Sequence, residues 1–237
     1  NKSDGLTTMW NAQRDRLAYQ YRSLSDGDGS WYSMRGNVDY QRTSKKNKDR
    51  MITLSYKIST QPQNSDYYTD YKDIKDPFEM DIVKKFLLNN SHSDGKTNTT
   101  EHTFQVDYTT PIGKLHTIEA GAKYIIRNNL SDNKLFEAEG VSDNYEYNND
   151  RSSKYKHDIL AAYLGYTLRY KTFSFKPGVR YEYTSQDVKY LAGAIGPEAD
   201  FSTSYNDFVP SVTMGIKIGK TQNLRGGYNM RIWRPGI

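Results

Sequence analysis

Few residues in this chain have the types and spacing that chemistry requires. Oxygen-bearing side chains alternate in the run Asp26-Gly27-Asp28-Gly29-Ser30, as they do in a calcium-binding loop, but the bidentate glutamate that completes such a loop is absent further along. A tight hairpin turn accounts for the same run, because glycine tolerates positive φ, and we expect a turn there. The four histidines share no metal-ligand spacing: His92, His102, His116 and His157. We therefore predict neither a metal site nor a cofactor.

Catalytic motifs are also missing from the sequence. The chain contains no cysteine, which excludes a disulfide scaffold, a thiolate metal site and a cysteine nucleophile. No nucleophile motif or phosphate-binding loop occurs, and the Gly226-Gly227 pair lies within an alternating run, where glycine permits close packing or a bend. We predict that the protein is not an enzyme.

The elements that position the remaining side chains are β-strands with one apolar and one polar face. After a polar turn at Ser44 to Asp49, apolar residues recur at every second position as Ile52, Leu54, Tyr56 and Ile58. The residues between them are threonine, serine and lysine, so one face of this strand is apolar and the other is polar.

Short and long connections alternate along the chain. The three further strand pairs turn at Thr110 to His116, Tyr170 to Thr172 and Gly219 to Asn223. The pairs are separated by long polar segments, which we predict to be extracellular loops: Gln61 to Thr100, Asn129 to Lys154 and Ser185 to Asn206. This alternation is typical of an antiparallel transmembrane β-barrel with short turns on one side of the membrane and long loops on the other.

The composition agrees with a barrel and excludes a helical membrane protein. Only 35% of the residues are hydrophobic and the mean hydropathy is -0.89, so no window approaches the roughly 18 apolar residues of a spanning helix. Barrel strands need apolar residues only at alternate positions, and their loops and interior are polar. The 21 tyrosines suit both strands and the membrane interface.

The strand count is nine, which is odd. The ninth predicted strand is Arg14 to Arg22, joined to Trp31 by a short loop at Ser25 to Ser30. Bacterial single-chain barrels have even strand numbers, and nine strands leave an open edge on each side. No basic and apolar signal segment occurs at Asn1. We therefore expect residues 1–237 to be one partial barrel domain, unable to close alone.

One segment departs from the period of two. Asp76-Pro77-Phe78-Glu79 has the residues of a helix start, and Ile82, Val83, Phe86 and Leu87 follow at helical spacing. We predict one amphipathic helix of about three turns in the longest loop. Its apolar stripe either packs against the loop or barrel rim, or serves as a lid or a partner-binding element.

The strand period also divides the side chains between lipid and lumen. The residues predicted to face lipid are Val38, Ile52, Val106, Ala120, Leu164, Val179, Met214 and Tyr228. The basic residues of opposite parity form a predicted lumen-facing basic wall: Arg35, Lys57, Lys123, Arg127, Arg169, Lys176, Arg180, Lys217, Arg225 and Arg231. Four acids share that parity: Asp39, Asp107, Glu119 and Glu182. Such a wall either attracts an anionic cargo, or its cations pair with acids of an internal plug or with one another across strands.

The long segments carry the opposite charge. Residues from Gln61 to Thr100 include seven acids (Asp66, Asp70, Asp73, Asp76, Glu79, Asp81 and Asp94) against five bases. Nucleic-acid binding would require Lys and Arg clustered with aromatic residues on an exposed face, so we predict no nucleic-acid partner.

Six runs, in this order, resemble the barrel of TonB-dependent outer-membrane receptors of the outer membrane protein β-barrel family. They are Gly36 to Tyr40, Gln105 to Pro111, Ala161 to Tyr163, Gly178 to Tyr183, Phe208 to Ser211, and Tyr228 to Pro235. The resemblance covers the chain from Gly36 to its end. It implies an all-β fold, a barrel of about 22 strands of which this chain is a fragment, and a location in the outer membrane in contact with its lipid.

The resemblance also implies a function. Receptors of this kind have a plug domain and an N-terminal region that contacts the TonB energy-coupling system, and neither is present in residues 1–237. The implied activity is uptake of a scarce or large nutrient, an anionic one if the basic wall attracts it. The alternative is a surface protein that does not transport, such as an adhesin or a structural partner in an envelope complex. The sequence does not name the cargo.

Overall fold

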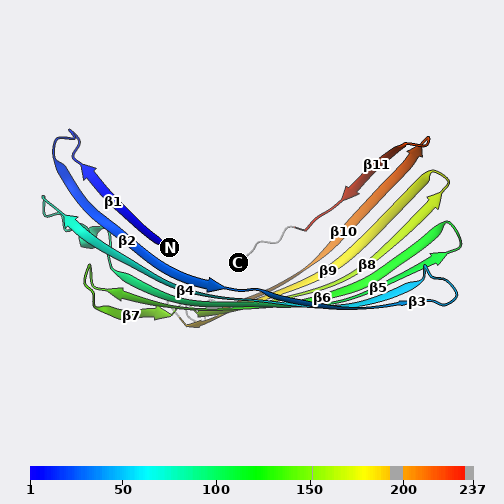
Figure 1. The fold of residues 1–237 in the computed structure, drawn as a ribbon, viewed down its shortest axis with the longest axis horizontal. Coiled ribbons are helices and arrows are strands. Elements are labelled where there is room, and N and C mark those ends of the chain that lie inside the picture. The colour runs from blue at the N-terminus through cyan, green and yellow to red at the C-terminus, as the bar shows by residue number, and fades with distance from the viewer. Residues whose placement is uncertain (151, 193–199, 233–237) are drawn as a thin grey trace.

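The chain forms one curved antiparallel sheet (Figure 1). The computed structural model describes residues 1–150, 152–192 and 200–232. The strands are β1 (Lys2–Trp10), β2 (Leu17–Trp31), β3 (Met34–Thr43), β4 (Met51–Lys75), β5 (Ser91–Ile112), β6 (His116–Ala138), β7 (Tyr145–Asp150), β8 (Ser152–Tyr170), β9 (Phe173–Ala192), β10 (Phe201–Ile218) and β11 (Gln222–Asn229). One helix, α1 (Ile82–Lys85), lies in the β4–β5 connection. The described helix is neither long nor apolar enough to cross a membrane. The predicted all-β antiparallel fold is confirmed.

Hydrogen-bonded neighbours follow the order β1-β2-β4-β5-β6-β8-β9-β10-β11. Strand β3 lies beyond the end of β2 along the same side of β4, since Trp31 pairs with Gln63 and Met34 with Thr60. Strand β7 pairs with the end of β6. The sheet is thus nine strands wide, as predicted. Strands β2 and β3 lie end to end beside β4 and count once, and β1 supplies the ninth strand.

The predicted turn at Asp26 to Ser30 is wrong, and the predicted strand Arg14 to Arg22 has different bounds. It begins at Leu17 and continues without a turn to Trp31 as β2, whose residues from Asp26 to Ser30 pair with Tyr68 to Asn64 of β4. The two glycines serve the sheet rather than a turn. A Cβ on Gly27 would overlap the ring of Tyr67, and a Cβ on Gly29 would lie 3.3 Å from the carbonyl oxygen of Asn64.

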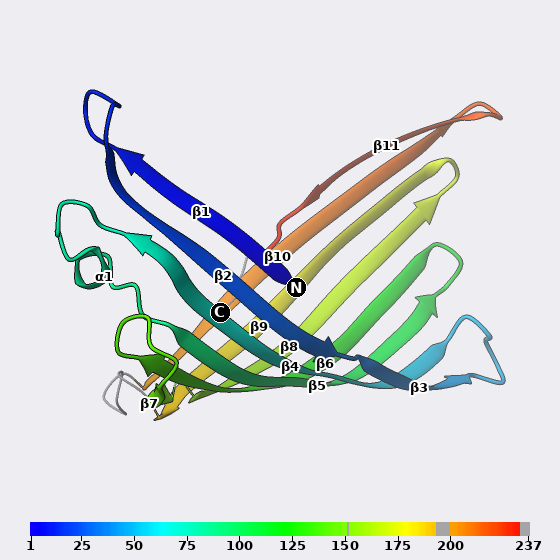
Figure 2. The same cartoon turned by 60° about the vertical axis from the view of Figure 1, so that its left-hand side comes forward.

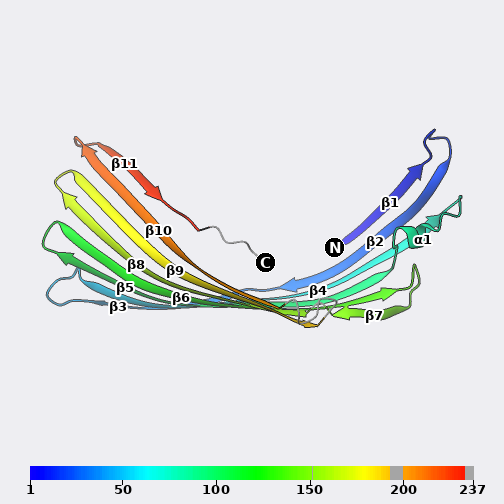
Figure 3. The ribbon, with the colours of Figure 1, turned by 180° about the vertical axis from the view of Figure 1, so that it is seen from behind.

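The sheet is a trough that does not close. In the described residues, β1 pairs only with β2 and β11 only with β10. Viewed from behind, these two outer strands stand on opposite sides of the opening (Figure 3). A sheet of this curvature needs further strands to become a barrel.

The four predicted short turns gather on one rim, and α1 lies on the other together with the β1–β2 turn (Figure 2). The β3–β4, β5–β6, β8–β9 and β10–β11 turns share the first rim, which confirms the predicted orientation. Gly113 and Gly219 adopt φ of 67° and 70° in two of these turns, a conformation that glycine allows without steric cost. Lys171 adopts φ of 51° in a third.

The segments predicted to be long loops are mostly strand. Strands β4 and β5 continue to Lys75 and from Ser91, and β6 continues to Ala138. The sequence signal ended early because strand residues beyond a membrane meet water on both faces and so need no apolar alternation. Their backbone ladder nevertheless continues, with Thr69 paired to Ser91 and Ser91 to Glu137.

The helix is shorter than the predicted three turns. Glu79 and Asp81 adopt left-handed backbone angles, with φ of 52° and 51°, so helix formation starts only at Ile82 and ends at Lys85. The side chains of Ile82 and Leu88 are buried, and the Phe86 ring lies 5.0 Å from the ring of Tyr19. Ile82 and Phe86 of the predicted stripe therefore pack against the loop and rim, whereas Leu87 is exposed.

A small polar core fixes the α1 connection to its neighbour. The Asn90 side chain accepts a hydrogen bond from the Tyr71 amide (2.7 Å) and donates one to the Ser142 carbonyl (3.0 Å). The Tyr145 hydroxyl donates to the Asp70 carboxylate at 2.5 Å. Burial raises the pKa of Tyr145, and the Asp70 carboxylate raises it further. Both connections are thus tied to the strands below them.

The convex face carries the predicted apolar band. Cross-strand pairing places Val38, Tyr56, Phe104, Tyr124 and Leu160 in one row of that face. All the residues predicted to face lipid occupy this face. It also holds tyrosines, and aromatic residues are expected at the edges of the lipid band: Tyr40, Tyr56, Tyr108, Tyr124, Tyr166, Tyr170 and Tyr181. Trp233, for which the sequence predicts the same place, lies outside the described residues.

The two faces predict opposite responses to the same substitution. Val106→Arg places a charge on the convex face at membrane depth and should destabilise the folded barrel by about 2 to 4 kcal/mol. Thr53→Arg places the same group on the concave face beside Asp107 and should cost less than about 1 kcal/mol. Denaturant unfolding of the full-length protein in lipid vesicles measures both. Equal destabilisation would contradict the assignment of the faces.

Candidate functional site

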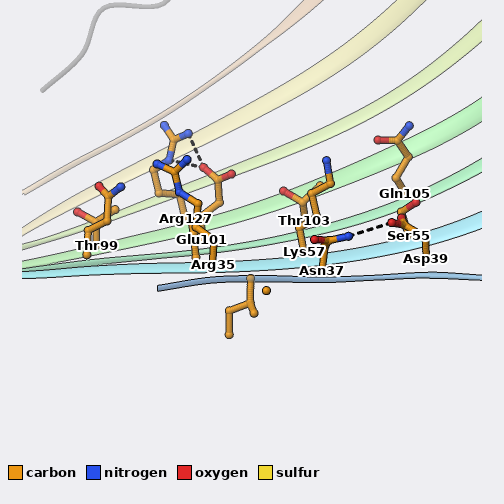
Figure 4. A pocket seen from close by; sticks show the side chains of 14 residues that line it. Arg35, Asn37, Asp39, Ser55, Lys57, Thr99, Glu101, Thr103, Gln105 and Arg127 are labelled. Carbon is orange, nitrogen blue, oxygen red and sulfur yellow. Dashed lines mark hydrogen bonds and ion pairs between the residues drawn. The ribbon is translucent and has the colours of Figure 1, made fainter. Parts of the chain in front are cut away.

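The concave face carries the predicted basic residues. Side chains of paired residues lie on one side of a sheet, so the register follows a row from Arg35 through Ser59, Glu101 and Arg127 to His157. In Figure 4 the labelled side chains of this region stand on the side toward which the strands curve.

Nine of the ten predicted basic residues are strand residues on this face, which we call the basic wall: Arg35, Lys57, Lys123, Arg127, Arg169, Lys176, Arg180, Lys217 and Arg225. Arg231 lies beyond the end of β11. That this wall lines a pore stays a prediction.

A hollow of about 870 Å³ lies in the basic wall across β3, β4, β5 and β6. Its basic side chains are Arg35, Lys57 and Arg127, and its acidic ones are Asp39 and Glu101. Asp39 accepts a hydrogen bond from the Asn37 amide at 3.0 Å. The hollow is open and polar, and its floor is the sheet itself (Figure 4). Such a surface can hold an anionic group by charge-assisted hydrogen bonds.

Cross-strand and same-strand ion pairs neutralise part of the basic wall. Arg127 pairs with Glu101 at 2.5 Å, Lys176 with Glu119 at 2.6 Å, and Arg180 with Glu182 at 2.6 Å. In the part of the chain that the structure describes, the other six members form no ion pair with an acidic side chain: Arg35, Lys57, Lys123, Arg169, Lys217 and Arg225. Pairing on the sheet therefore accounts for three of the nine cations, and attraction of an anionic cargo stays a prediction.

The predicted set of acids on this face was incomplete. Glu101 pairs across the ladder with Arg127, and Asp207 pairs with Glu182, so both belong to the concave face. Counting positions in steps of two from Gln105 and from Val209 would have found them. The concave face is therefore less positive than the sequence alone predicted.

A tyrosine network occupies the middle of the wall. The Tyr163 hydroxyl donates a hydrogen bond to Asp107, and the Gln105 amide donates to the other oxygen of that carboxylate at 2.8 Å. Gly121, the cross-strand partner of Tyr163, makes room for the ring, because a Cβ there would overlap it. Glycine is therefore required at this position by close packing.

The other residues considered for chemistry are dispersed. His102 and His116 bond the hydroxyls of Tyr56 and Tyr166 at 2.9 and 2.5 Å, and the ring of His92 stacks on Tyr68. Asp26 pairs with Lys2 at 2.8 Å. Among the described residues, no group of three or more His, Cys, Asp or Glu side chains could hold a metal ion.

Comparison with known proteins agrees with this geometry. The model of the outer membrane protein beta-barrel family matches residues 41–237. The ferric citrate transporter FecA, in a crystal structure of its unliganded form, is similar in fold, with a TM-score of 0.53 and 12% identity over 95% of this chain and 35% of FecA.

Two further structures match over similar lengths. The ferric yersiniabactin uptake receptor FyuA from Yersinia pestis has a TM-score of 0.44 and 8% identity over 94% of this chain and 40% of its own. The alcaligin outer membrane receptor FauA from Bordetella pertussis has a TM-score of 0.42 and 12% identity over 96% of this chain and 40% of its own. This chain thus spans well under half the length of each structure. Curated protein sequences gave no match.

An apolar convex face and a charged concave face on one curved antiparallel sheet define an outer-membrane β-barrel protein. The family match covers most of the chain, and the chain belongs to the outer membrane protein beta-barrel family. Its location is the outer membrane.

The packing of Tyr163 on Gly121 gives a test of the wall. Gly121→Ala should displace the ring and break its hydrogen bond to Asp107, lowering the unfolding free energy by about 1 to 3 kcal/mol. Gly226→Ala is the matched control, because a Cβ on Gly226 meets no atom within 4 Å. Urea unfolding of the full-length protein in detergent compares the two. A control that loses as much stability as Gly121→Ala would refute the packing role.

Proposed function

We propose that this chain forms part of the barrel of a TonB-dependent receptor that takes up a nutrient too large or too scarce for passive porins. The observation that carries the proposal is the charged, hollowed concave face on strands whose other face is apolar. Once further strands complete the barrel, this face lines an enclosed path across the membrane. The family membership and the FecA-like fold support the proposal.

The basic wall is proposed to line the part of this path at membrane depth, where it attracts any anionic group that the plug or the cargo presents. Six of its cations form no ion pair in the described residues, and a low-dielectric enclosure concentrates the field that they produce. We propose binding and passage rather than catalysis. Energy for passage would come from the TonB system, acting through a plug and an N-terminal region of the whole protein.

A second candidate function rests on the opposite rim. Leu87 is 77% exposed and Phe78 is 51% exposed in the connection that contains α1, and this connection is fixed by Ile82 and Asn90. A rigid support that presents apolar side chains suits contact with another envelope protein. A surface protein that does not transport would use this rim and would not need the basic wall.

Uptake in cells separates these functions. A strain that lacks the full-length gene is screened for growth on limiting nutrients and then complemented with variants. Arg35→Glu combined with Lys57→Glu should slow uptake at low ionic strength by about tenfold, because it reverses the charge that the hollow presents to acidic groups of the plug or of the cargo. Lys46→Glu combined with Lys48→Glu makes the same charge change in the β3–β4 turn and should leave uptake unchanged.

Deletion of the TonB system should abolish uptake in the complemented strain. Growth defects that are independent of TonB and unaffected by the Arg35 and Lys57 changes would favour the surface-protein function.

A further inference from the structure

Between the basic wall and the rim that carries α1, the concave face of five strands bears no charged side chain. We call this surface the vestibule. It consists of the inward-facing, odd-numbered residues of 3–9, 19–31, 61–71, 91–99 and 129–135. Each of these residues is serine, threonine, asparagine, glutamine, glycine, tyrosine, tryptophan, leucine or methionine. The next inward residue of β6, Glu137 at the rim, is charged.

The charges of these same strand segments lie on the outer face. Asp26, Asp66 and Asp94 are outward, as are Lys2, Arg22 and Lys134. They pair there, with Lys2 at 2.8 Å from Asp26 and Arg22 at 3.2 Å from Asp4. Water can reach both faces of this part of the sheet, so solubility alone does not explain why one face excludes charge.

Aromatic side chains occur at intervals along the vestibule, from the rim to the basic wall. At the rim, the ring of Tyr21 lies 5.9 Å from that of Tyr71. Tyr67 follows four residues along β4, covering Gly27, and Trp31 lies a further four residues down, opposite Gln63. Each step is about 13 Å at roughly 3.3 Å per residue. Tyr67 is 47% exposed and Trp31 is 76% exposed, so both rings have free faces.

Uncharged hydrogen-bonding groups flank these rings. Ser65 and Ser93 occupy the positions beside Tyr67, and Thr97 lies in the row of Trp31. In the adjoining rows, Asn129 donates to Thr99 at 2.9 Å and Asn133 donates to Ser131 at 2.9 Å. Hydroxyl and amide groups both donate and accept, so they match a ligand rich in hydroxyls.

We propose that the vestibule binds a neutral, hydroxyl-rich ligand built of rings, which is the chemistry of an uncharged oligosaccharide. Flat ring faces stack on Trp31 and Tyr67, and ligand hydroxyls bond the serine, threonine and amide side chains. An anion gains no cation here, and meets one only at Arg35, four residues below Trp31. The inference rests on the proposed function, since it takes the concave face as the receptor interior, and it names the cargo class.

Adjacent tyrosines on opposite faces provide a matched test. Tyr67 faces the vestibule, whereas Tyr68 faces outward and stacks on His92 at 4.1 Å. Full-length receptor in detergent is titrated calorimetrically with neutral hexasaccharides of the gluco, manno and xylo series, with a hexameric oligogalacturonide and with ferric citrate. At least one neutral series should bind, and Tyr67→Ala and Trp31→Ala should each weaken it by about tenfold. Tyr68→Ala should change the affinity by less than about twofold.

A charge variant strengthens the test. Ser65→Asp introduces a carboxylate beside the Tyr67 ring. It should lower the affinity for the neutral ligand less than Tyr67→Ala does. It should lower the affinity for the oligogalacturonide more than that for the neutral ligand, because like charges repel. Heat-modifiable gel mobility checks that each variant is folded. If Tyr67→Ala misfolds, Tyr67→Phe replaces it. This variant keeps the stacking face, so its affinity should stay within about threefold of the unsubstituted receptor.

Three outcomes overturn the proposal: none of the three neutral series binds, the anionic probes bind in the vestibule more tightly than the neutral ones, or Tyr67→Ala and Tyr68→Ala have equal effects. These outcomes are distinct from failure of the proposed function, because binding in detergent does not require TonB. If uptake depends on TonB but is unaffected by the Tyr67 and Trp31 substitutions, only this inference fails. Vestibule binding without TonB-dependent uptake removes only the transport function.

Discussion

The backbone hydrogen bond in an apolar medium is the constraint on which this structure depends. At membrane depth no water is available, so each peptide group must bond to a neighbouring strand. The long uninterrupted ladder between β4 and β5, from Met51 to Thr69, satisfies this requirement. Every other feature, including the distribution of charge, is built on strands that this requirement holds in register.

Because strands in register alternate their side chains, the sheet separates two environments. At membrane depth, Leu54 and Val106 pair on the convex face, and Ser55 and Gln105 pair on the concave face one position away. Beyond the membrane the distribution of charge is the opposite. Charged side chains such as Asp66 and Lys134 lie on the convex face, and the concave face carries uncharged ones. One ladder thus presents a basic wall deep in the trough and an uncharged surface at its mouth.

Local contacts then decide how much of the charge is available. Arg127 and Arg180 are held by Glu101 and Glu182, whereas Arg35 and Lys57 form no ion pair within the described part of the chain. Glycines admit bulky rings at two places, Gly27 beneath Tyr67 and Gly121 beneath Tyr163. These pairs combine a strand position of low intrinsic propensity with an aromatic neighbour that covers it.

The sequence by itself determined the fold class, the two faces at membrane depth and the rim shared by the four short turns from β3–β4 to β10–β11, because alternation with a period of two is a local property of the chain. It misplaced the turn at Asp26 to Ser30 and the ends of β4, β5 and β6, and it overlooked Glu101 and Asp207. Only the tertiary structure decided these points. Pairing between strands that are distant in the chain keeps polar segments extended and sets which charges meet, and neither effect leaves a local pattern.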